Sequence, residues 1–469
     1  MNATPPSRFA DVEALAEPRL RFNIDVRDAI DTHPLRGLAT YGPASQQRLQ
    51  ALTNRASIAL ISPEADWQDV AGLFKQLQQP YHADPPYWPR YPGFASTYGI
   101  EVKAADNHVH HLVSRDIETR MSTRAEAIAA LTELFSTQAI RLHAQLDDFN
   151  IAVIYLPERW GIAYTTEDGF DLHDYIKAAF AVQGIPTQIV RQKTLQHSVT
   201  EVLWTLSIAI YAKMGGIPWT LAGLAPETAY IGLAYTIRHD QPSATGKRRF
   251  VTCCSQLLDA DGSGAEFTLF DTQSDDFEGD NPFLSRNAMR SVAARTLNVY
   301  LGRHGVPPKR VVLHKTTRFT RDEIGGAHEA LAGIADVELL QIQDETSWQG
   351  LLLDGREQAA AYPVQRGCAL QLDDYSALLW TQGNAASVVG KNWFKEGVGI
   401  PRPLLLRRWA GSTDLHNVAS EALALTKMNV NNGNLYDTLP ATLRYASLLA
   451  KVVKRTELPS RNYPLRFFI

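Results

Sequence analysis

Cysteine is scarce in this sequence. Three of the 469 residues are cysteine, and Cys253 and Cys254 are adjacent while Cys368 lies far from them. Three thiols placed in this way make neither a disulfide framework nor the spacing of a zinc site. Such scarcity is typical of proteins from a reducing compartment. We therefore expect a cytoplasmic protein.

Long hydrophobic runs are absent as well. The best apolar stretch, residues 202–212, is too short to span a bilayer and ends at Lys213. The first residues of the chain lack the basic and apolar regions of a signal peptide. We therefore expect no association with membranes.

An excess of positive charge is also missing. Lys and Arg number 46 and Asp and Glu number 50, which gives a net charge of -4. This balance excludes a uniformly basic coat for nucleic acid, but it does not exclude a local basic channel, because net charge does not report how charge is distributed. Hydrophobic residues make up 45% of the chain, enough for a packed core. Glycine-rich dinucleotide and P-loop motifs are missing, as is the nucleophile motif of serine hydrolases.

The first half of the chain alternates strand and helix patterns. Residues 57–63 and 149–157 are apolar runs typical of buried parallel strands. Helical patterns cover residues 125–146, 171–183 and 199–214. This order predicts a parallel sheet covered by helices.

The second half begins with three long strand patterns at residues 229–237, 249–259 and 266–273, which predict an antiparallel meander. Further segments continue the alternation: a helix at 285–304, a strand at 309–316, a helix at 327–334, a strand at 336–343 and a helix at 440–456. Five mixed strands followed by helices predict a ribonuclease H-like layout, with the boundary between the two halves near residues 200–225.

Four polar residues stand out around the end of the first half. His173 and Lys177 are four apart in a helical segment and share one face. Gln188 follows a Gly-Ile-Pro turn, and Lys213 closes a helix before Gly-Gly. Taken singly, these are surface residues. Taken together, two cations and two neutral donors suit an anion pocket, provided that the fold brings them together.

Several stretches resemble the Argonaute family, in its short prokaryotic branch. They include DLHDYIKAAF within residues 171–195, KMGGIPW within 208–222, VVLHKTT within 309–323, the segment 36–48, and residues 424–453 with the final FFI. The resemblance implies an α/β chain with a Rossmann-like MID domain followed by an RNase H-like PIWI domain, and no N or PAZ domain. Residues 1–205 would hold the N-terminal segment and the MID domain, and residues 206–469 the PIWI domain.

The resemblance also implies a binding site for the 5′ phosphate of a guide strand. The matching positions are His173, Lys177, Gln188 and Lys213, where His173 replaces the commoner tyrosine. Family members hold a divalent cation against this phosphate with the C-terminal carboxylate, here that of Ile469. Oxygen ligands from Ile469 and Gln188 would suit Mg²⁺.

The target-cleaving site of the family requires closely placed carboxylates, because they hold the two metal ions used in cleavage. The matching positions here are Ala234, Lys315 and Ser447, so three of the four ligand positions are lost. Lys315 is expected to repel a metal ion. The resemblance therefore predicts a chain without nuclease activity.

Short Argonautes of this type resemble the sensing half of a two-protein bacterial defence system. The chain is expected to bind a 5′-phosphorylated guide RNA, recognise single-stranded target DNA and activate a partner. The partner would carry an APAZ region and an effector domain: sirtuin-like, Toll/interleukin-receptor-like or a nuclease. Two alternatives remain open. One is an autonomous, guide-dependent RNase H-like nuclease, and the other is a small-molecule α/β enzyme with an apolar pocket at a strand switch point.

Overall fold

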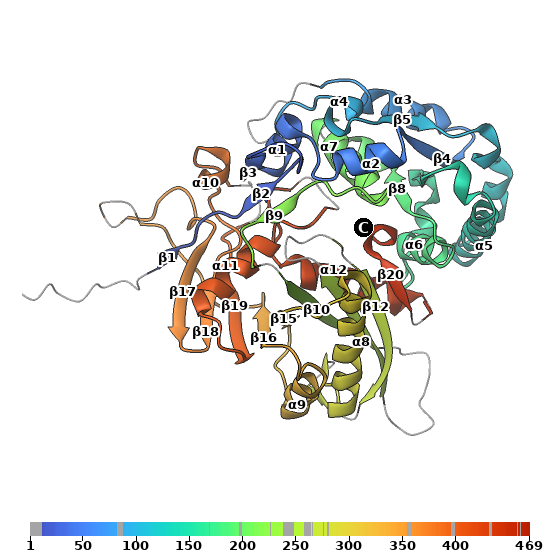
Figure 1. Cartoon of the computed structure of the whole chain (residues 1–469). Coiled ribbons are helices and arrows are strands. Elements are labelled where there is room, and N and C mark those ends of the chain that lie inside the picture. The colour runs from blue at the N-terminus through green and yellow to red at the C-terminus, as the bar shows by residue number, and fades with distance from the viewer. Residues whose placement is uncertain are drawn as a thin grey trace, which may run out of the picture.

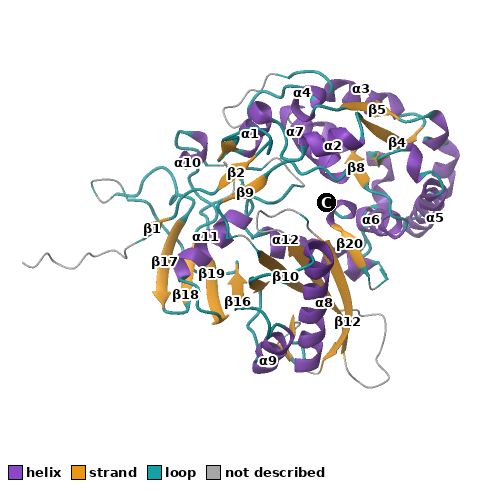
Figure 2. Ribbon diagram, in the orientation of Figure 1, coloured by secondary structure: helices purple, strands orange, loops and turns teal. Residues whose placement is uncertain are grey.

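Two lobes make up the chain in the computed structural model, and the C-terminal end lies between them (Figure 1). Figure 2 shows the strands at the centre of each lobe and the helices around them. The structure describes the chain except for residues 1–11, 82–87, 168, 197–198, 226, 238–247, 258–263, 265, 275, 279–280, 354–355, 357, 395–398, 431–433, 457 and 460.

The smaller sheet is fully parallel and has the order β5-β4-β7-β8, with β6 also paired to β4. Its strands are β4 (Arg55–Pro63), β5 (Glu101–Ala104), β6 (His111–Val113), β7 (Ile151–Leu156) and β8 (Thr187–Arg191). Every residue of β7 is buried. Such a strand needs cover on both faces of the sheet.

Helices supply that cover. On one face lie α5 (Arg124–His143) and α6 (Leu172–Val182), and on the other lie α3 (Trp67–Leu77), α4 (Phe94–Tyr98) and α7 (Val199–Lys213). The longest, α5, begins with a reciprocal cap in which Thr123 and Glu126 each bond the other's main-chain amide. The predicted Rossmann-like fold, a parallel sheet covered by helices, is confirmed.

The larger sheet has the order β1-β17-β18-β19-β16-β15-β10-β11-β12-β20. Its strands are β1 (Glu13–Ala14), β10 (Thr228–Ile237), β11 (Arg248–Leu257), β12 (Glu266–Ser274), β15 (Arg310–Lys315), β16 (Asp336–Gln343), β17 (Cys368–Asp373), β18 (Ser376–Leu379), β19 (Leu404–Ala410) and β20 (Asn462–Pro464). The meander β10–β12 and the parallel strands β10, β15 and β16 agree with the prediction. The expected five strands were too few. Strands β1, β18 and β20 have two to four residues and leave little periodic pattern, whereas β17 and β19 have six and seven residues and were missed.

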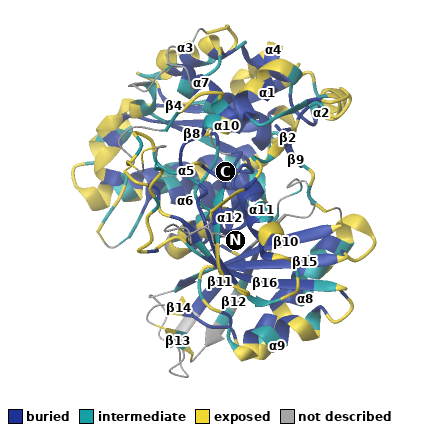
Figure 3. Cartoon of the chain, turned by 90° about the vertical axis from the view of Figure 1, so that its left-hand side faces the viewer, coloured by how far each residue is buried: buried dark blue, intermediate teal, exposed yellow. Residues whose placement is uncertain are grey.

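Helices also cover both faces of the larger sheet. One face carries α8 (Arg286–His304) and α9 (Arg321–Ala330), and the other carries α11 (Leu415–Leu425) and α12 (Ala441–Arg455). Figure 3 shows buried central strands beneath helices with exposed outer faces. Helix α9 begins six residues before the predicted start at 327, because Thr320 and Glu323 cap it there.

The N-terminal residues join the two lobes. Strand β1 pairs with β17 of the larger sheet, and β2 (Arg19–Arg21) pairs with β3 (Ile30–Asp31) and β9 (Thr220–Ala222). The sequence division at residue 205 did not anticipate these contacts of the first residues with the second half. The remaining elements are α1 (Pro34–Tyr41), α2 (Gln46–Leu52), α10 (Ala386–Val389), β13 (Phe277–Glu278), β14 (Asn281–Pro282) and the 3-10 turns η1 (Asn107–Val109), η2 (Arg115–Arg120), η3 (Leu146–Asp148), η4 (Glu158–Ala163), η5 (Gln192–Gln196) and η6 (Leu465–Phe467).

None of the helices within the described residues combines the length and the apolar character needed to cross a bilayer.

Candidate anion-binding site between the lobes

Two helices of the smaller lobe deliver lysines to its boundary with the C-terminal residues. Helix α6 starts where the Asp171 carboxylate accepts hydrogen bonds from the main-chain amides of His173 and Asp174, at 2.9 and 3.3 Å. Helix α7 ends at Lys213, and the chain turns at Gly215, whose φ of +91° favours glycine. These two helix ends set the positions of the side chains between the lobes.

Four of the predicted site residues meet here. Lys177 Nζ donates to the carbonyl oxygen of Phe468 at 2.8 Å and to the main-chain oxygen of Ile469. Lys213 Nζ donates to Oε1 of Gln188 at the start of β8. Lys177 is 5% exposed and Lys213 is 1% exposed. The structure therefore brings Lys177, Gln188, Lys213 and Ile469 together from four separate stretches of the chain.

Burial disfavours the charged form of both lysines in this position. Burial lowers the pKa of Lys177 to about 7, although the nearby Asp174 carboxylate acts in the opposite direction. Burial, followed by repulsion from Lys177, lowers the pKa of Lys213 well below its usual value. Two mutually repelling, buried ammonium groups are costly unless an anion accompanies them. The arrangement suits an anionic ligand.

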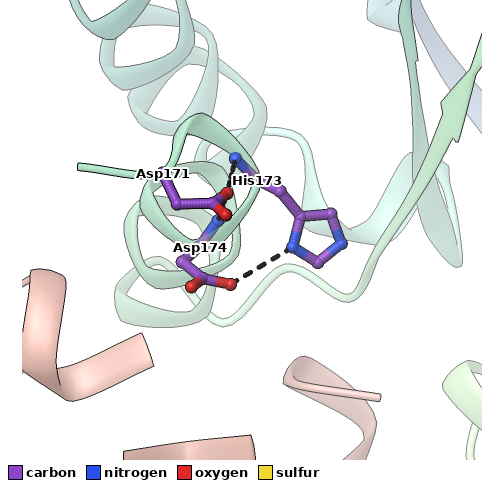
Figure 4. Close-up of side chains that lie close together, drawn as sticks. All are labelled: Asp171, His173 and Asp174. Carbon is purple, nitrogen blue, oxygen red and sulfur yellow. Dashed lines mark hydrogen bonds and ion pairs between the residues drawn. The ribbon is translucent and has the colours of Figure 1, made fainter. Parts of the chain in front are cut away.

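His173 lies beside these lysines at the start of α6. Its side chain is 34% exposed, and its Nδ1 lies 3.3 Å from Oδ1 of the buried Asp174 (Figure 4). Burial lowers the pKa of His173, Asp174 raises it, and Lys177 and Arg191 lower it. The ring is therefore close to cations and to one carboxylate. Sequence reasoning missed Asp174, although its position three residues before Lys177 on one helix was the available signal.

Asp171, His173 and Asp174 form the one group of three potential metal ligands found among the described residues, with ligand atoms within 4.8 Å of one another. Two of these side chains already have local tasks. Asp171 caps α6, and Asp174 contacts the His173 ring. The group lies in the smaller lobe, away from the strands where the family resemblance places target cleavage.

The oxygen atoms that are expected to bind Mg²⁺ accept hydrogen bonds from the two lysines. Gln188 Oε1 accepts from Lys213, and the main-chain oxygen of Ile469 accepts from Lys177. Amide and carboxylate oxygens are suitable ligands for Mg²⁺, but the two adjacent lysines oppose a cation whenever they are protonated. A cation fits these residues only together with an anion that offsets the lysines.

The three positions matched to the cleavage site lie on β10, β15 and α12. The strand register pairs Leu233 with Lys315, so Ala234 and Lys315 leave opposite faces of the sheet. Lys315 is fully buried and bonds Glu323 of α9 at 2.6 Å. The expectation that Lys315 repels a metal beside Ala234 is therefore wrong, because its ammonium points to the α8–α9 side. Ser447 is exposed on α12.

A cavity of about 220 Å³ adjoins Ile469, and neither Lys177 nor Lys213 is among its lining residues. Arginines reach it from three elements: Arg48 from α2, Arg303 from α8 and Arg466 from η6. Nε of Arg466 is buried and has no hydrogen-bond partner among the described atoms. Trp219 and Tyr445 contribute aromatic surface to the wall. Both aromatic side chains are almost fully buried, so the arginines are the groups of this cavity that suit contacts with a nucleic acid backbone.

The two helix-covered sheets define a two-lobed α/β protein with a cationic site between the lobes. No protein-family model matches the chain. Its sequence is similar to the Argonaute of Thermus thermophilus, at 27% identity over 60% of this chain and 36% of that protein. It is also similar to the Argonaute of Aquifex aeolicus, at 20% identity over 74% of this chain and 45% of that protein. The chain spans less than half the length of these curated relatives.

Solved Argonaute structures share the fold of nearly the whole chain. Clostridium butyricum Argonaute, solved with a guide DNA and a 19-mer target DNA, matches with a TM-score of 0.68 and 15% identity, covering 98% of this chain and 55% of that one. A. aeolicus Argonaute matches with a TM-score of 0.63 and 18% identity over 98% of this chain and 56% of that one. Sequence and fold thus relate this chain to the Argonaute family, and it has the fold of the family's MID–PIWI part.

Proposed function

We propose that this chain binds a guide strand by its 5′ phosphate and presents the guide to a complementary target. The observation that carries the proposal is the meeting of two buried lysines, Lys177 and Lys213, with Gln188 and Ile469. A terminal phosphate bears enough negative charge to offset both ammonium groups and offers several acceptor oxygens. His173 lies on the same helix as Lys177 and is available to contact the same phosphate.

The strand continues from this pocket into the arginine-lined cavity. Arg48, Arg303 and Arg466 would contact backbone phosphates, which carry affinity but no sequence information. Base pairing between guide and target then supplies the specificity. By resemblance to short prokaryotic Argonautes, the guide is RNA and the target is single-stranded DNA.

Target cleavage is not part of the proposed function. Ala234 and Ser447 offer no carboxylate, and Lys315 is committed to a buried ion pair. The one metal-ligand group among the described residues lies at the start of α6. A guide binder without cutting chemistry must act through another protein. We infer a cytoplasmic bacterial defence sensor whose bound target activates an APAZ-containing effector, either NAD-consuming or a nuclease.

Mg²⁺ would bind in the same pocket, together with the phosphate. Gln188 and the carboxylate of Ile469 would hold it beside the phosphate, where it would neutralise phosphate charge. Because the lysines oppose a cation in the empty pocket, calorimetry should detect Mg²⁺ binding with a 5′-phosphorylated oligonucleotide present and none without it. Equal binding of Mg²⁺ in both cases would remove the metal from the proposed site.

The function is tested on nucleic acid that copurifies with the chain and its partner from their native cells. Short strands should be radiolabelled by a kinase only after phosphatase treatment, because their 5′ ends already carry phosphate. Recovery of no short strands, or of strands with free 5′ hydroxyls, would contradict the proposal. Incubation of the loaded chain with labelled target and Mg²⁺ should leave the target intact. Guide-dependent cleavage would favour the autonomous nuclease.

A further inference from the structure

Asp174 lies close to two side chains of the proposed phosphate pocket, those of His173 and Lys177. Its carboxylate is 2% exposed and approaches Nδ1 of His173 to 3.3 Å (Figure 4). Its charge also acts on Lys177, one turn further along α6. A carboxylate buried this deeply is stabilised by nearby positive charge, and it stabilises that charge in return. Asp174 and the His173 ring are therefore electrostatically coupled.

The contact with Asp174 affects the orientation of the His173 ring as well as its charge. A carboxylate at Nδ1 accepts a hydrogen bond from the N–H of that nitrogen, so Nε2 is left to face another group. His173 is about one-third exposed, whereas Asp174 is buried behind it. The other charged groups facing the ring are Lys177 on α6 and Arg191 at the end of β8, which both oppose a positive ring. Asp171 is occupied by the main-chain amides that it caps.

We propose that Asp174 is a positioning residue: its carboxylate holds His173 by Nδ1 and so directs Nε2 at the 5′ phosphate, to which Nε2–H donates when the phosphate is bound. The proposal rests on the proposed function and names the residue that lets a histidine serve in the phosphate pocket. When phosphate arrives, the ring takes its second proton from solvent. Asp174 itself touches neither phosphate nor strand.

The test compares the affinities of the full chain for one oligonucleotide with a 5′ phosphate and with a 5′ hydroxyl. The variants are Asp174→Asn, His173→Ala and the double variant, with the exposed Asp147→Asn as a matched control. At pH 6, Asp174→Asn and His173→Ala should each lower the phosphate-to-hydroxyl affinity ratio about tenfold, the scale of one charge-assisted hydrogen bond. The double variant should resemble either single variant, because both remove the same contact.

The pH profile separates positioning from a purely structural role. Burial, with Lys177 and Arg191, holds the pKa of His173 below its ordinary value, and Asp174 acts in the opposite direction. The contribution of the charged ring is therefore present at low pH and is lost as the pH rises through the pKa that the ring has beside the bound phosphate. The difference between the wild type and Asp174→Asn should therefore be smaller at pH 8 than at pH 6. An unchanged ratio in Asp174→Asn, a tenfold effect that persists without His173, or an effect independent of pH would each overturn the inference. A wild type without preference for the 5′ phosphate would instead contradict the proposed function.

Discussion

Lys315 has a structural task at a position that the family resemblance links to cleavage. Its ammonium bonds Glu323 Oε1 at 2.6 Å and lies 4.9 Å from the Phe319 ring centre. The other oxygen of Glu323 accepts from the Thr320 amide at the start of α9. The pair therefore ties β15 to the first turn of α9.

Breaking the ion pair between Lys315 and Glu323 should destabilise the protein. Lys315→Ala leaves Glu323 buried without its cation and should lower the free energy of unfolding by about 3–5 kcal/mol, measured by chemical denaturation. Lys309→Ala, which removes an exposed ion pair with Glu227, should change stability little. A loss in Lys315→Ala no larger than in the control would contradict the buried pair. Lys315→Asp should not create cleavage, because its side chain would face away from Ala234.

Among the elements, the contact between β10 and α12 is unusually close. A Cβ atom placed on Gly232 would lie 2.2 Å from the carbonyl oxygen of Thr442, in the first turn of α12. Thr442 also bonds Nδ1 of the buried His314 on β15 at 2.8 Å. Glycine at position 232 thus allows α12 to lie directly on the strands that carry Ala234.

Gly232→Ala should separate α12 from the sheet and destabilise the protein by about 1–3 kcal/mol, the range typical of overpacked cores. The matched control is Gly302→Ala in α8, where no atom beyond the local helix backbone lies within 4 Å of the added Cβ. That change should stabilise the protein by about 0.5–1 kcal/mol, because alanine favours a helix interior. Thermal unfolding of both variants checks the pair of predictions, and equal shifts would contradict the packing account.

Long periodic elements could be predicted from the sequence, and short ones could not. Strands β4, β7 and β10 and helices α5 and α8 carry enough apolar repeats to be recognised. Strands β1 and β20 have two and three residues, so only tertiary pairing creates them. In the candidate site, His173, Lys177, Gln188 and Lys213 were named from spacing and resemblance. The direction of Lys315 was not foreseeable, because it depends on the register between β10 and β15.

Across the whole molecule, a buried ion cluster attaches the N-terminal segment to the larger lobe. Glu17 contacts Arg366 at 3.1 Å and Lys427 at 2.5 Å, and all three side chains are almost fully buried. Lys427 also donates to the carbonyl oxygen of Thr32. The residue after Lys427, Met428, lines the arginine cavity. The N-terminal segment thus supports the wall of the proposed strand path.

Glu17→Gln should destabilise the protein at pH 7 by about 3–5 kcal/mol, because two buried cations lose their counter-ion. Burial already lowers the pKa of Lys427 to about 8, against the effect of Glu17, and the substitution should lower it further. As the pH rises through that lowered value toward 8, Lys427 becomes neutral in the variant, so part of the loss should disappear. Denaturant titrations at pH 7 and pH 9 test this. A loss of stability in Glu17→Gln that grows with pH would contradict the role of Glu17 as the counter-ion of Lys427.

The space between the lobes is proposed to recognise a 5′ phosphate. The most direct measurement is the affinity of one guide oligonucleotide with a 5′ phosphate and with a 5′ hydroxyl, for the wild type and for Lys177→Ala with Lys213→Ala. A control removes two exposed lysines, Lys75 and Lys309. The account predicts that the wild type and the control prefer the phosphorylated guide by about tenfold or more, and that the pocket variant loses this preference. Equal weakening of both guides in the pocket variant would contradict it.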